Sequence, residues 1–470
     1  MKRIKTDVVV IGAGPGGYAA AFFAADEGKE VILIEKDKLG GVCLNRGCIP
    51  SKALIHTTEL ILEAKESSEK GVSFSNPKID LKKLRAWKNE IISKLSGGVA
   101  QLAKARKVKV IEGRAIFDTA KSLRVETDKK QVMIDFDDVI IATGSKPNIP
   151  AVFDLGNKRI MTSTEALELE DIPKKLMVIG GGYIGMELGL VYAGLGSEIV
   201  MVEAMKDILM GADRDLVRPV KRKAQNLFKE LRLDTKVKSL ATKGKFVEVK
   251  CISPDGKTKT EKYDKVLVSI GRTPNVNDLG LKDIGIEQDE KGFIKINHKC
   301  ETNIANVYAI GDVAGGILLA HKASKEARIA VETILGHNVS SEKCIIPAVV
   351  FTSPEVAWAG ITETEAKENG ISVKVAKFPW AASGRAKTLG ADNGLTKLIV
   401  EKETDRVLGV GIVGKGAGEL ISEGTLAIEM GATAKDLAEI VHPHPTLSET
   451  IMECAESLYG VATHTISKRQ

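Results

Sequence analysis

Short runs of branched apolar residues that break into glycine recur along this chain. The first run covers residues 7–11 and is followed by a glycine cluster, an alanine-rich segment over 18–26 and a second apolar run over 31–34. An apolar run, a glycine turn, a helical segment and another apolar run are typical of a βαβ unit in a parallel sheet. The same succession returns with apolar runs at 176–179 and 199–202. The pattern therefore predicts two such units.

Both units carry the glycine spacing of a dinucleotide-binding turn. The first glycine permits the tight turn, the second lets the backbone approach a pyrophosphate, and the third allows close packing of helix on strand. An acid at the end of the second strand is placed to accept hydrogen bonds from a ribose hydroxyl. The second set lies 168 positions after the first, so we infer an internal duplication that binds two dinucleotides. The sets are Gly12, Gly14, Gly17 and Glu35, and Gly180, Gly182, Gly185 and Glu203.

Glu203 also bears on the choice of the second dinucleotide. A carboxylate there repels a 2′-phosphate, whereas an arginine is expected beside a phosphorylated ribose. The nearest following base is Lys206. The second unit therefore favours NAD over NADP. A solvated acid at a strand end is the alternative, but the registration of Glu203 with Glu35 argues against it.

Three further apolar runs end in small residues, at 138–145, 265–272 and 307–312. The third ends in Asp312, which would project at the carboxyl end of a strand, where open α/β sheets bind ligands. Asp312 could also be the N-cap of a helical segment that begins near Leu318. Both roles are compatible with the pattern.

The pattern changes from about residue 347 onward. Apolar runs at 349–351, 373–375, 396–400 and 407–413 have the spacing of hairpin strands, and helical patterns cover 362–369 and 419–430. This part has no nucleotide fingerprint. It predicts an α+β domain with an antiparallel sheet.

A histidine and a glutamate stand close together near the carboxyl end. His444 and Glu449 are separated by a turn-favouring Pro-Thr, and the chain has 7 histidines in all. A carboxylate that orients an imidazole and stabilises the imidazolium is what a general acid/base needs. Taken alone, the pair is better explained by a surface turn.

Two cysteines, Cys43 and Cys48, lie a few residues after Glu35, within the stretch 40–52. As zinc or iron–sulfur ligands they would need further cysteines or histidines nearby, and His56 alone is close, so we expect no metal. Inert core thiols would not need the glycines before them or Pro-Ser-Lys after them. A helix that starts near Cys48, one turn before Lys52, would favour its thiolate. A redox-active pair is the better interpretation.

Composition limits the class of protein. A chain of 470 residues should form about three or four domains. With 43% hydrophobic residues, 28% charged residues and a net charge of +6 that forms no basic stripe, we expect neither a nucleic-acid nor a membrane partner. Six cysteines make no disulfide framework, and the start shows no signal peptide, so we expect a cytoplasmic protein whose dithiol is catalytic.

The stretch 40–52 resembles the redox-disulfide motif of the pyridine nucleotide–disulfide oxidoreductases, and most closely that of the branch that oxidises dihydrolipoyl groups. Further motifs follow in the order of the family and cover essentially the whole chain. They are Glu35, Thr143–Ser145, Gly180–Glu187, Gly311–Asp312, Leu319–Lys322, Ser353–Val356 and His444–Glu449.

The resemblance implies an α/β fold with two Rossmann-like domains, for FAD and for NAD, and a carboxyl-terminal α+β dimerisation domain. The implied boundaries are 1–147 (FAD, first part), 148–271 (NAD), 272–342 (return to the FAD-binding and central part) and 343–470 (interface). The implied FAD contacts are Gly12, Gly14, Gly17, Glu35, Lys36, Lys52, Ala115, Thr143, Gly144, Ser145, Asp312, Leu319, Ala320 and His321. The implied NAD contacts are Gly180, Gly182, Tyr183, Ile184, Gly185, Glu187, Glu203 and Gly271.

The resemblance also implies a mechanism and partners. His444, oriented by Glu449 and supplied by the other subunit of a homodimer, would deprotonate a dihydrolipoyl thiol that attacks Cys43. Cys48 would then pass the electrons to FAD, which reduces NAD⁺, and Lys52 would pair with Glu187 beside the flavin. The substrate would be the lipoyl domain of a 2-oxo acid dehydrogenase acyltransferase or a glycine-cleavage carrier protein.

Relatives with other activities are the alternatives. Glutathione-type reductases favour NADPH, which Glu203 opposes, and mercuric reductases add a cysteine pair near the carboxyl end, where residues 458–470 have none. Flavin oxidases and peroxidases use a single cysteine, and an idle redox-sensing scaffold would not need all of these motifs. Tyr183 is either a lid over the flavin or a packing residue of the fingerprint helix.

Overall fold

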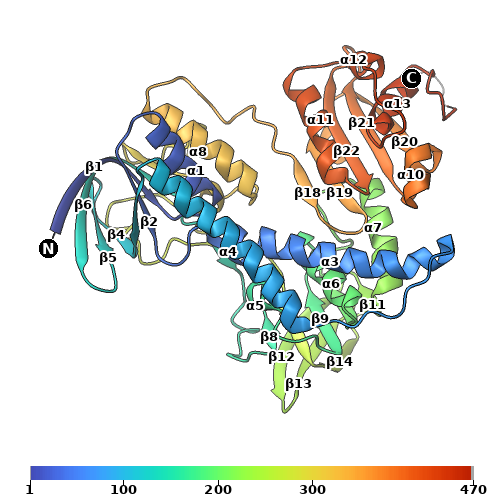
Figure 1. Cartoon of the computed structure of the whole chain (residues 1–470), viewed down its shortest axis with the longest axis horizontal. Coiled ribbons are helices and arrows are strands. Elements are labelled where there is room, and N and C mark those ends of the chain that lie inside the picture. Colours follow the sequence, from blue (N-terminus) through green and yellow to red (C-terminus); the bar gives the residue numbers. More distant parts are fainter. Residues whose placement is uncertain (1, 467–470) are drawn as a thin grey trace.

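The computed structural model describes residues 2–466, and residues 1 and 467–470 lie outside this description. Its chain forms a first, mainly parallel sheet, a second parallel sheet and a carboxyl-terminal antiparallel sheet, with helices and small sheets between them (Figure 1). Among residues 2–466, no helix is both long and apolar enough to cross a membrane.

The first sheet has the order β3-β2-β1-β6-β5-β4, and β17 pairs with β6. The strands β3, β2, β1, β6 and β17 run parallel to one another, as the predicted βαβ unit requires. Residues alternate between two apolar clusters on the two faces, so both faces are buried and the runs are continuously apolar. The strands are β1 (Lys2–Ile11), β2 (Val31–Glu35), β3 (Lys109–Glu112), β4 (Arg114–Thr119), β5 (Ser122–Glu126), β6 (Gln131–Ile141) and β17 (Val307–Ala309).

Helices cover one face of the first sheet. In Figure 1, α1 (Pro15–Asp26) and α8 (Ala320–Ile334) lie side by side, although some 300 residues separate them in the sequence. A further long helix is α4 (Leu81–Ala105). The short 3₁₀ helices are η1 (Ser67–Lys70) and η2 (Gly311–Ala314). The chain returns to this sheet with the strand β17, and the residues that follow β17 lie beside the first glycine turn.

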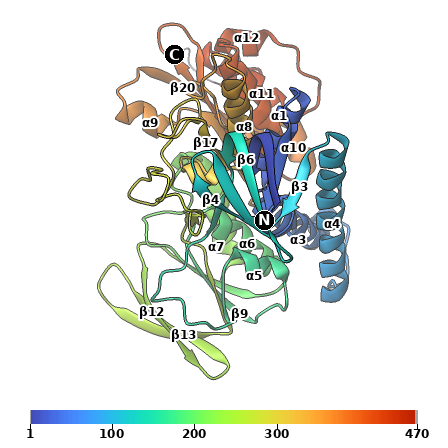
Figure 2. The same cartoon turned by 90° about the vertical axis from the view of Figure 1, so that its left-hand side faces the viewer.

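The second sheet repeats the first on a smaller scale, in the order β11-β10-β9-β15-β8, with all pairs parallel. A three-stranded antiparallel sheet, at the bottom of Figure 2, packs on one side of it. The strands of the parallel sheet are β8 (Ile160–Met161), β9 (Lys175–Ile179), β10 (Glu198–Val202), β11 (Glu230–Arg232) and β15 (Lys265–Val268). The remaining elements are α5 (Ser163–Glu168), α6 (Tyr183–Gly194), α7 (Arg214–Leu227), β12 (Lys236–Lys243), β13 (Phe246–Ile252) and β14 (Thr258–Tyr263).

Two short strands join the parallel units. β7 (Ser145–Pro147) and β16 (Arg272–Pro274) pair antiparallel where the chain leaves the first unit and where it returns. The domain boundaries stay a prediction. The second sheet and the carboxyl-terminal sheet each lie within one predicted range, and the first sheet takes β17 from the predicted return segment 272–342.

The carboxyl-terminal sheet is antiparallel throughout, in the order β18-β19-β22-β21-β20, as predicted. The pattern missed β19, because its alanine and glycine residues carry little strand propensity. The strands are β18 (Ala348–Val350), β19 (Glu355–Gly360), β20 (Val373–Pro379), β21 (Leu395–Glu401) and β22 (Val407–Gly414). The helices are α9 (Glu363–Glu368), α10 (Gly384–Leu389), α11 (Ala417–Glu429), α12 (Ala434–Glu439) and α13 (Glu449–Leu458), with the 3₁₀ helix η3 (Trp380–Ala382).

A pair of helices carries the two cysteines. The short α2 (Gly41–Arg46) contains Cys43, and α3 (Cys48–Glu66) begins at Cys48, where the sequence placed a helix start. Figure 1 shows α3 crossing the centre of the molecule, between the first sheet and the carboxyl-terminal sheet. This placement puts the dithiol where the three parts of the chain meet.

Candidate active site

The two glycine turns have matching geometry. Gly12 and Gly180 have φ angles of 100° and 107°, in the left-handed region that favours glycine. A Cβ atom on Gly17 would lie 1.8 Å from the Gly12 carbonyl oxygen, and one on Gly185 would lie 1.9 Å from that of Gly180. Side chains at these positions would force helix and strand apart. The internal duplication is therefore present in the backbone itself.

The middle glycine of each turn faces open space. Gly14 and Gly182 are the N-caps of α1 and α6, with nearly identical extended backbones. A Cβ on Gly14 would meet only the Cα of Gly41, at 4.0 Å, and one on Gly182 would meet nothing within 4 Å. The unpaired N–H groups of each helix start adjoin this space, which fits the pyrophosphate of a dinucleotide. The residues present thus fit both FAD and NAD.

The two strand-end acids hold these turns in place. Glu35 accepts a hydrogen bond from the Ala13 N–H (2.7 Å), and Glu203 accepts one from the Gly181 N–H (2.5 Å). The second oxygen of each carboxylate accepts from the N–H two residues further on, at 2.9 and 2.7 Å. Burial raises the pKa of Glu35, against these backbone hydrogen bonds. Each oxygen keeps a lone pair for a ribose hydroxyl, and that role stays a prediction.

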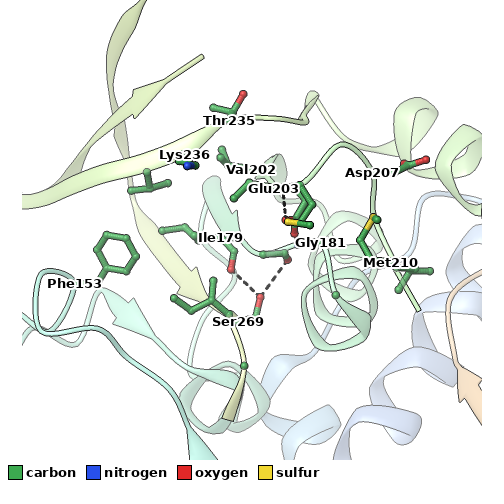
Figure 3. Close-up of a pocket in the computed structure, with 18 residues that line it drawn as sticks. Phe153, Ile179, Gly181, Val202, Glu203, Asp207, Met210, Thr235, Lys236 and Ser269 are labelled. Carbon is green, nitrogen blue, oxygen red and sulfur yellow. Dashed lines mark hydrogen bonds between the residues drawn. The ribbon is translucent and has the colours of Figure 1, made fainter. Parts of the chain in front are cut away.

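A cavity of about 560 Å³ opens at the second glycine turn. Figure 3 shows Asp207 and Met210 on one side of Glu203, and Phe153 on the other. Of the predicted NAD contacts, Gly180, Gly182, Glu203 and Gly271 line it, whereas Tyr183, Ile184, Gly185 and Glu187 lie further along α6. The lining that the sequence did not indicate includes Phe153, Met205, Asp207, Met210, Thr235 and Lys236.

Asp312 lies in η2, next to the first unit. Its carboxylate accepts a hydrogen bond from the Ser145 hydroxyl and lies 3.6 Å from the Arg272 Nε. Arg272 also donates to the Ser145 hydroxyl, at 2.6 Å. The N-cap interpretation of Asp312 is wrong, because the N-cap of α8 is Leu319 and no side chain caps that helix. The sequence did not single out Arg272, which the pairing of β7 with β16 brings to this place.

A buried ion pair on α8 holds the turn that carries Asp312. Lys322 and Glu326 lie 2.8 Å apart on successive turns of the helix. Glu326 accepts from the Gly311 N–H (2.7 Å), and Lys322 donates to the Gly315 carbonyl (2.7 Å). The ion pair therefore fixes both ends of the turn. No sequence pattern singles out Glu326, since a glutamate inside a helix is common.

The two active-site thiols differ sharply in acidity. No disulfide joins Cys43 and Cys48. Their side chains are instead hydrogen bonded to each other. The hydrogen bond from Cys43 lowers the pKa of Cys48 to about 7 against the effect of burial, and the charge of Lys52 adds to the lowering. The same hydrogen bond, together with burial, raises the pKa of Cys43. Cys48 is thus the more acidic thiol of the pair, and its role as the thiolate stays a prediction.

Lys52 makes the ion pair that was predicted. Its ammonium lies 2.9 Å from the carboxylate of the buried Glu187 on α6. Glu187 also accepts from the Phe351 N–H (3.0 Å), and Lys52 lies 4.3 Å from the centre of the Phe351 ring. One turn of α3 therefore connects the dithiol with the second unit and with the carboxyl-terminal domain.

The predicted imidazole–carboxylate pair is also formed. His444 Nδ1 lies 2.8 Å from Glu449 at the start of α13, and the other oxygen of Glu449 accepts from the Thr446 N–H (2.7 Å). These hydrogen bonds outweigh burial and lower the pKa of Glu449. The His444 side chain is 73% exposed, and within residues 2–466 no hydrogen bond or ion pair links it to the dithiol.

The remaining predicted FAD residues fall into three groups. Thr143 and Gly144 form the loop after β6, and the Thr143 hydroxyl donates to the Asn275 carbonyl (2.7 Å). Leu319, Ala320 and His321 start α8, where His321 contacts the Pro347 carbonyl through Nε2 (2.6 Å). Lys36 follows Glu35, and the side chain of Ala115 is buried in the first sheet, which leaves only its backbone for a ligand.

Tyr183 is the first residue of α6 and is 40% exposed. Burial of its hydroxyl raises its pKa, and its charged neighbours include Arg272, Asp312 and Glu187. A residue that served only to pack the fingerprint helix would be buried. Both interpretations of Tyr183 stay predictions.

The whole chain matches a known family in two parts. Residues 6–327 match the pyridine nucleotide-disulphide oxidoreductase family, and residues 346–455 match its dimerisation domain. The chain belongs to this family, which uses FAD and NAD, and the dimerisation domain supports the predicted homodimer. The family and the fold class predicted from the sequence are confirmed.

Similar proteins with curated names are dihydrolipoyl dehydrogenases. That of Buchnera aphidicola subsp. Schizaphis graminum is 45% identical over 472 residues, covering 100% of this chain and 99% of its own. That of Haemophilus influenzae is 46% identical over 466 residues, covering 98% and 97%. The function predicted from the sequence is that of these relatives.

Solved structures agree with this placement. LpdA from Mycobacterium tuberculosis has a TM-score of 0.89 at 28% identity, covering 97% of this chain and 100% of its own. The HOCl-induced flavoprotein disulfide reductase RclA from Escherichia coli has a TM-score of 0.85 at 27% identity, covering 96% and 99%.

Proposed function

We propose that this enzyme oxidises protein-bound dihydrolipoyl groups to the lipoyl disulfide and passes the two electrons through Cys43 and Cys48 and FAD to NAD⁺. The observation that carries the proposal is the dithiol at the start of α3, where Cys48 is the first residue of the helix and lies one turn before the Lys52–Glu187 ion pair. It occurs in a chain that aligns end to end with dihydrolipoyl dehydrogenases.

The two glycine turns hold the two cofactors in this proposal. Gly12, Gly14 and Glu35 bind the pyrophosphate and adenosine ribose of FAD, while Asp312 binds its ribityl chain. The corresponding set around Gly182 and Glu203 binds NAD in the cavity. Bound FAD supplies the two-electron carrier that connects the dithiol with the nicotinamide. The open space before each turn and the bonded acids support these roles.

The chain's own chemistry is thiol–disulfide exchange. His444 accepts a proton from one substrate thiol, and the thiolate attacks the Cys43 sulfur of the Cys43–Cys48 disulfide, whose bond breaks with Cys48 leaving as thiolate. The second substrate thiol attacks the mixed disulfide, closes the lipoyl ring and releases Cys43. The substrate has then lost two electrons, which the dithiol has gained, and two protons, which Cys43 and His444 hold. The lowered pKa of Cys48 makes it the better leaving group.

The acid/base comes from a second copy of the chain in this proposal. The exposure of His444 and the lack of a bond to its own dithiol support a position at an interface. Glu449 fixes the Nδ1 side of the ring, so that Nε2 is left for the substrate thiol. A homodimer therefore has two sites, each completed by the other subunit.

The proposed substrate indicates a partner, and the redox-active cysteines indicate a compartment. The dihydrolipoyl group is presented by the lipoyl domain of a 2-oxo acid dehydrogenase acyltransferase or by a glycine-cleavage carrier protein. The enzyme works in the cytoplasm, where reducing conditions make a persistent disulfide catalytic rather than structural.

The test compares two reactions of the purified holoenzyme. Oxidation of dihydrolipoamide with NAD⁺ is followed by NADH absorbance, beside reduction of glutathione disulfide with NADPH. We expect turnover in the first reaction only. Turnover only with glutathione disulfide and NADPH would contradict the proposed substrate and cofactor together.

A further inference from the structure

One wall of the dinucleotide cavity is a single segment, residues 205–213, here called the wall segment. Met205, Asp207, Leu209 and Met210 line the cavity, and Asp207 and Met210 are visible beside Glu203 in Figure 3. The Leu209 N–H donates to the carbonyl of Gly181 in the glycine turn, at 3.0 Å. The wall segment has no regular secondary structure before α7. Few backbone hydrogen bonds hold it, among them those of the Leu209 N–H and of the Met205 carbonyl, which accepts from the Asp234 N–H (2.9 Å), so side-chain contacts contribute to its position.

Arg214, the first residue of α7, holds the wall segment from within. Its guanidinium donates to the carbonyl oxygens of Ile208 (2.8 Å), Leu209 (2.6 Å) and Ala212. The same guanidinium lies 3.5 Å from Asp207. One side chain thus satisfies the carbonyls of the segment and fixes its shape, but not its place in the molecule.

Asp213, at the end of the wall segment, ties it to the carboxyl-terminal domain. The carboxylate accepts hydrogen bonds from the Glu363 N–H (3.0 Å) and from Thr364, by its N–H (3.3 Å) and hydroxyl (3.1 Å), at the start of α9. It also pairs with Lys397 on β21 at 2.8 Å. The side chain of Lys397 is only 1% exposed. A buried ammonium from another domain is therefore bound to the end of the wall segment.

Lys397 balances a group of carboxylates. Besides Asp213, it lies 3.1 Å from Asp215 and 2.6 Å from Glu363, and Lys377 contacts the last two from the outer side. Burial alone would raise the pKa of Asp213, but the hydrogen bond from Lys397 and those of the α9 backbone lower it. The group holds three carboxylates and two lysines, so loss of Lys397 leaves three carboxylates with one lysine.

The domains are also in close contact at this place. A Cβ on Gly411 of β22 would lie 2.5 Å from the Cδ1 atom of Leu216 on α7. The carboxyl-terminal sheet and α7 are therefore in direct contact beside the Lys397–Asp213 ion pair.

We propose that Lys397 is a positioning residue for the dinucleotide: from the carboxyl-terminal domain it holds Asp213, and through Asp213 it sets the wall segment against the ligand. The inference rests on the proposed binding of NAD in this cavity. It predicts that a residue of the dimerisation domain controls affinity for NAD without touching it.

The experiment uses Lys397→Met in the full-length holoenzyme. We expect the dissociation constant for NAD⁺, measured by titration calorimetry, to rise roughly three- to thirtyfold. The FAD content and the rate of enzyme reduction by dihydrolipoamide in the absence of NAD⁺ should stay unchanged, because the dithiol does not contact the wall segment. Lys397→Arg should restore most of the affinity, since it keeps the charge.

Three variants separate the explanations. Lys374→Met removes an ion pair with Asp405 in the same sheet (2.8 Å) and should leave NAD⁺ affinity intact. Adding Asp213→Asn to Lys397→Met removes an uncompensated carboxylate and should recover affinity in part. A Cβ on Gly182 would meet nothing within 4 Å. Gly182→Val should therefore fill the proposed pyrophosphate space and abolish NAD⁺ binding.

The outcomes are distinguishable. Unchanged NAD⁺ affinity in Lys397→Met, or an equal loss of affinity in Lys374→Met, would overturn the positioning role. So would parallel losses of NAD⁺ affinity, FAD content and dithiol reduction in Lys397→Met, since these indicate general destabilisation. Intact NAD⁺ binding in Gly182→Val would instead overturn the proposed NAD site, on which this inference rests.

Discussion

The hydrogen bond from Cys43 is the largest cause of the low pKa of Cys48, which makes it the most informative contact to remove. We compare Cys43→Ala, which has no donor, with Cys43→Ser, whose hydroxyl can still donate to the Cys48 thiolate. Both variants lose the disulfide and leave Cys48 as the single thiol of the pair. The difference between them therefore reports the hydrogen bond alone.

The size of the effect follows from the energy of that hydrogen bond. A hydrogen bond to a charged group is worth about 1.5–3 kcal/mol, and one pKa unit corresponds to about 1.36 kcal/mol. Its loss should raise the pKa of Cys48 from about 7 by roughly one to two units in Cys43→Ala. At pH 7 the thiolate fraction then falls from about one half to about 1–10%. The pKa should stay near its present value in Cys43→Ser.

The assay is the rate of alkylation by iodoacetamide as a function of pH, with Cys48 followed by peptide mass spectrometry. Because only the thiolate reacts, the rate rises with pH and levels off above the pKa of the thiol. We expect the midpoint near 7 for Cys43→Ser and between about 8 and 9 for Cys43→Ala. Equal midpoints in the two variants would refute the assignment of the low pKa to the hydrogen bond.

Three further predictions concern the other parts of the site. His444→Gln should slow enzyme reduction by dihydrolipoamide far more than electron exchange between flavin and NAD⁺ in stopped-flow experiments, and equal losses would contradict its role. Steady-state kcat/KM should favour NAD⁺ over NADP⁺ because of Glu203, and the opposite preference would remove Glu203 as the discriminator. Glu326→Ala should weaken FAD binding to the apoprotein, measured by flavin fluorescence, because it leaves Lys322 uncompensated at a cost of about 3–5 kcal/mol; unchanged affinity would show that the ion pair does not hold the Asp312 turn.

Local patterns were enough to predict the two nucleotide units. The glycines and acids that shape each turn act within about 25 residues of one another, and Gly17 and Gly185 are required by contacts with their own turns. The same holds for His444 and Glu449, which a five-residue separation brings within hydrogen-bond distance. Such contacts are encoded in spacing, so a sequence can reveal them without a fold.

Long-range contacts explain most of what the pattern missed. Arg272 reaches Ser145 across 127 positions, and Lys397 reaches Asp213 across 184, so neither pair has a spacing to recognise. Asp312 was given two roles because a carboxylate after a strand suits either a ligand or a helix start. The N-cap of α8 is Leu319, which rules out the helix-start role, and the ligand role stays a prediction. The sequence thus predicted the cofactor turns better than the contacts that position them.

The most direct test of the account is turnover by Cys48→Ser with dihydrolipoamide and NAD⁺, measured beside its FAD content. We expect the variant to keep its FAD, since the glycine turns and Asp312 are untouched. We expect it to lose NADH formation, because neither a disulfide nor the low-pKa thiolate can form. NADH formation at the wild-type rate by FAD-loaded Cys48→Ser would contradict the passage of electrons through this dithiol.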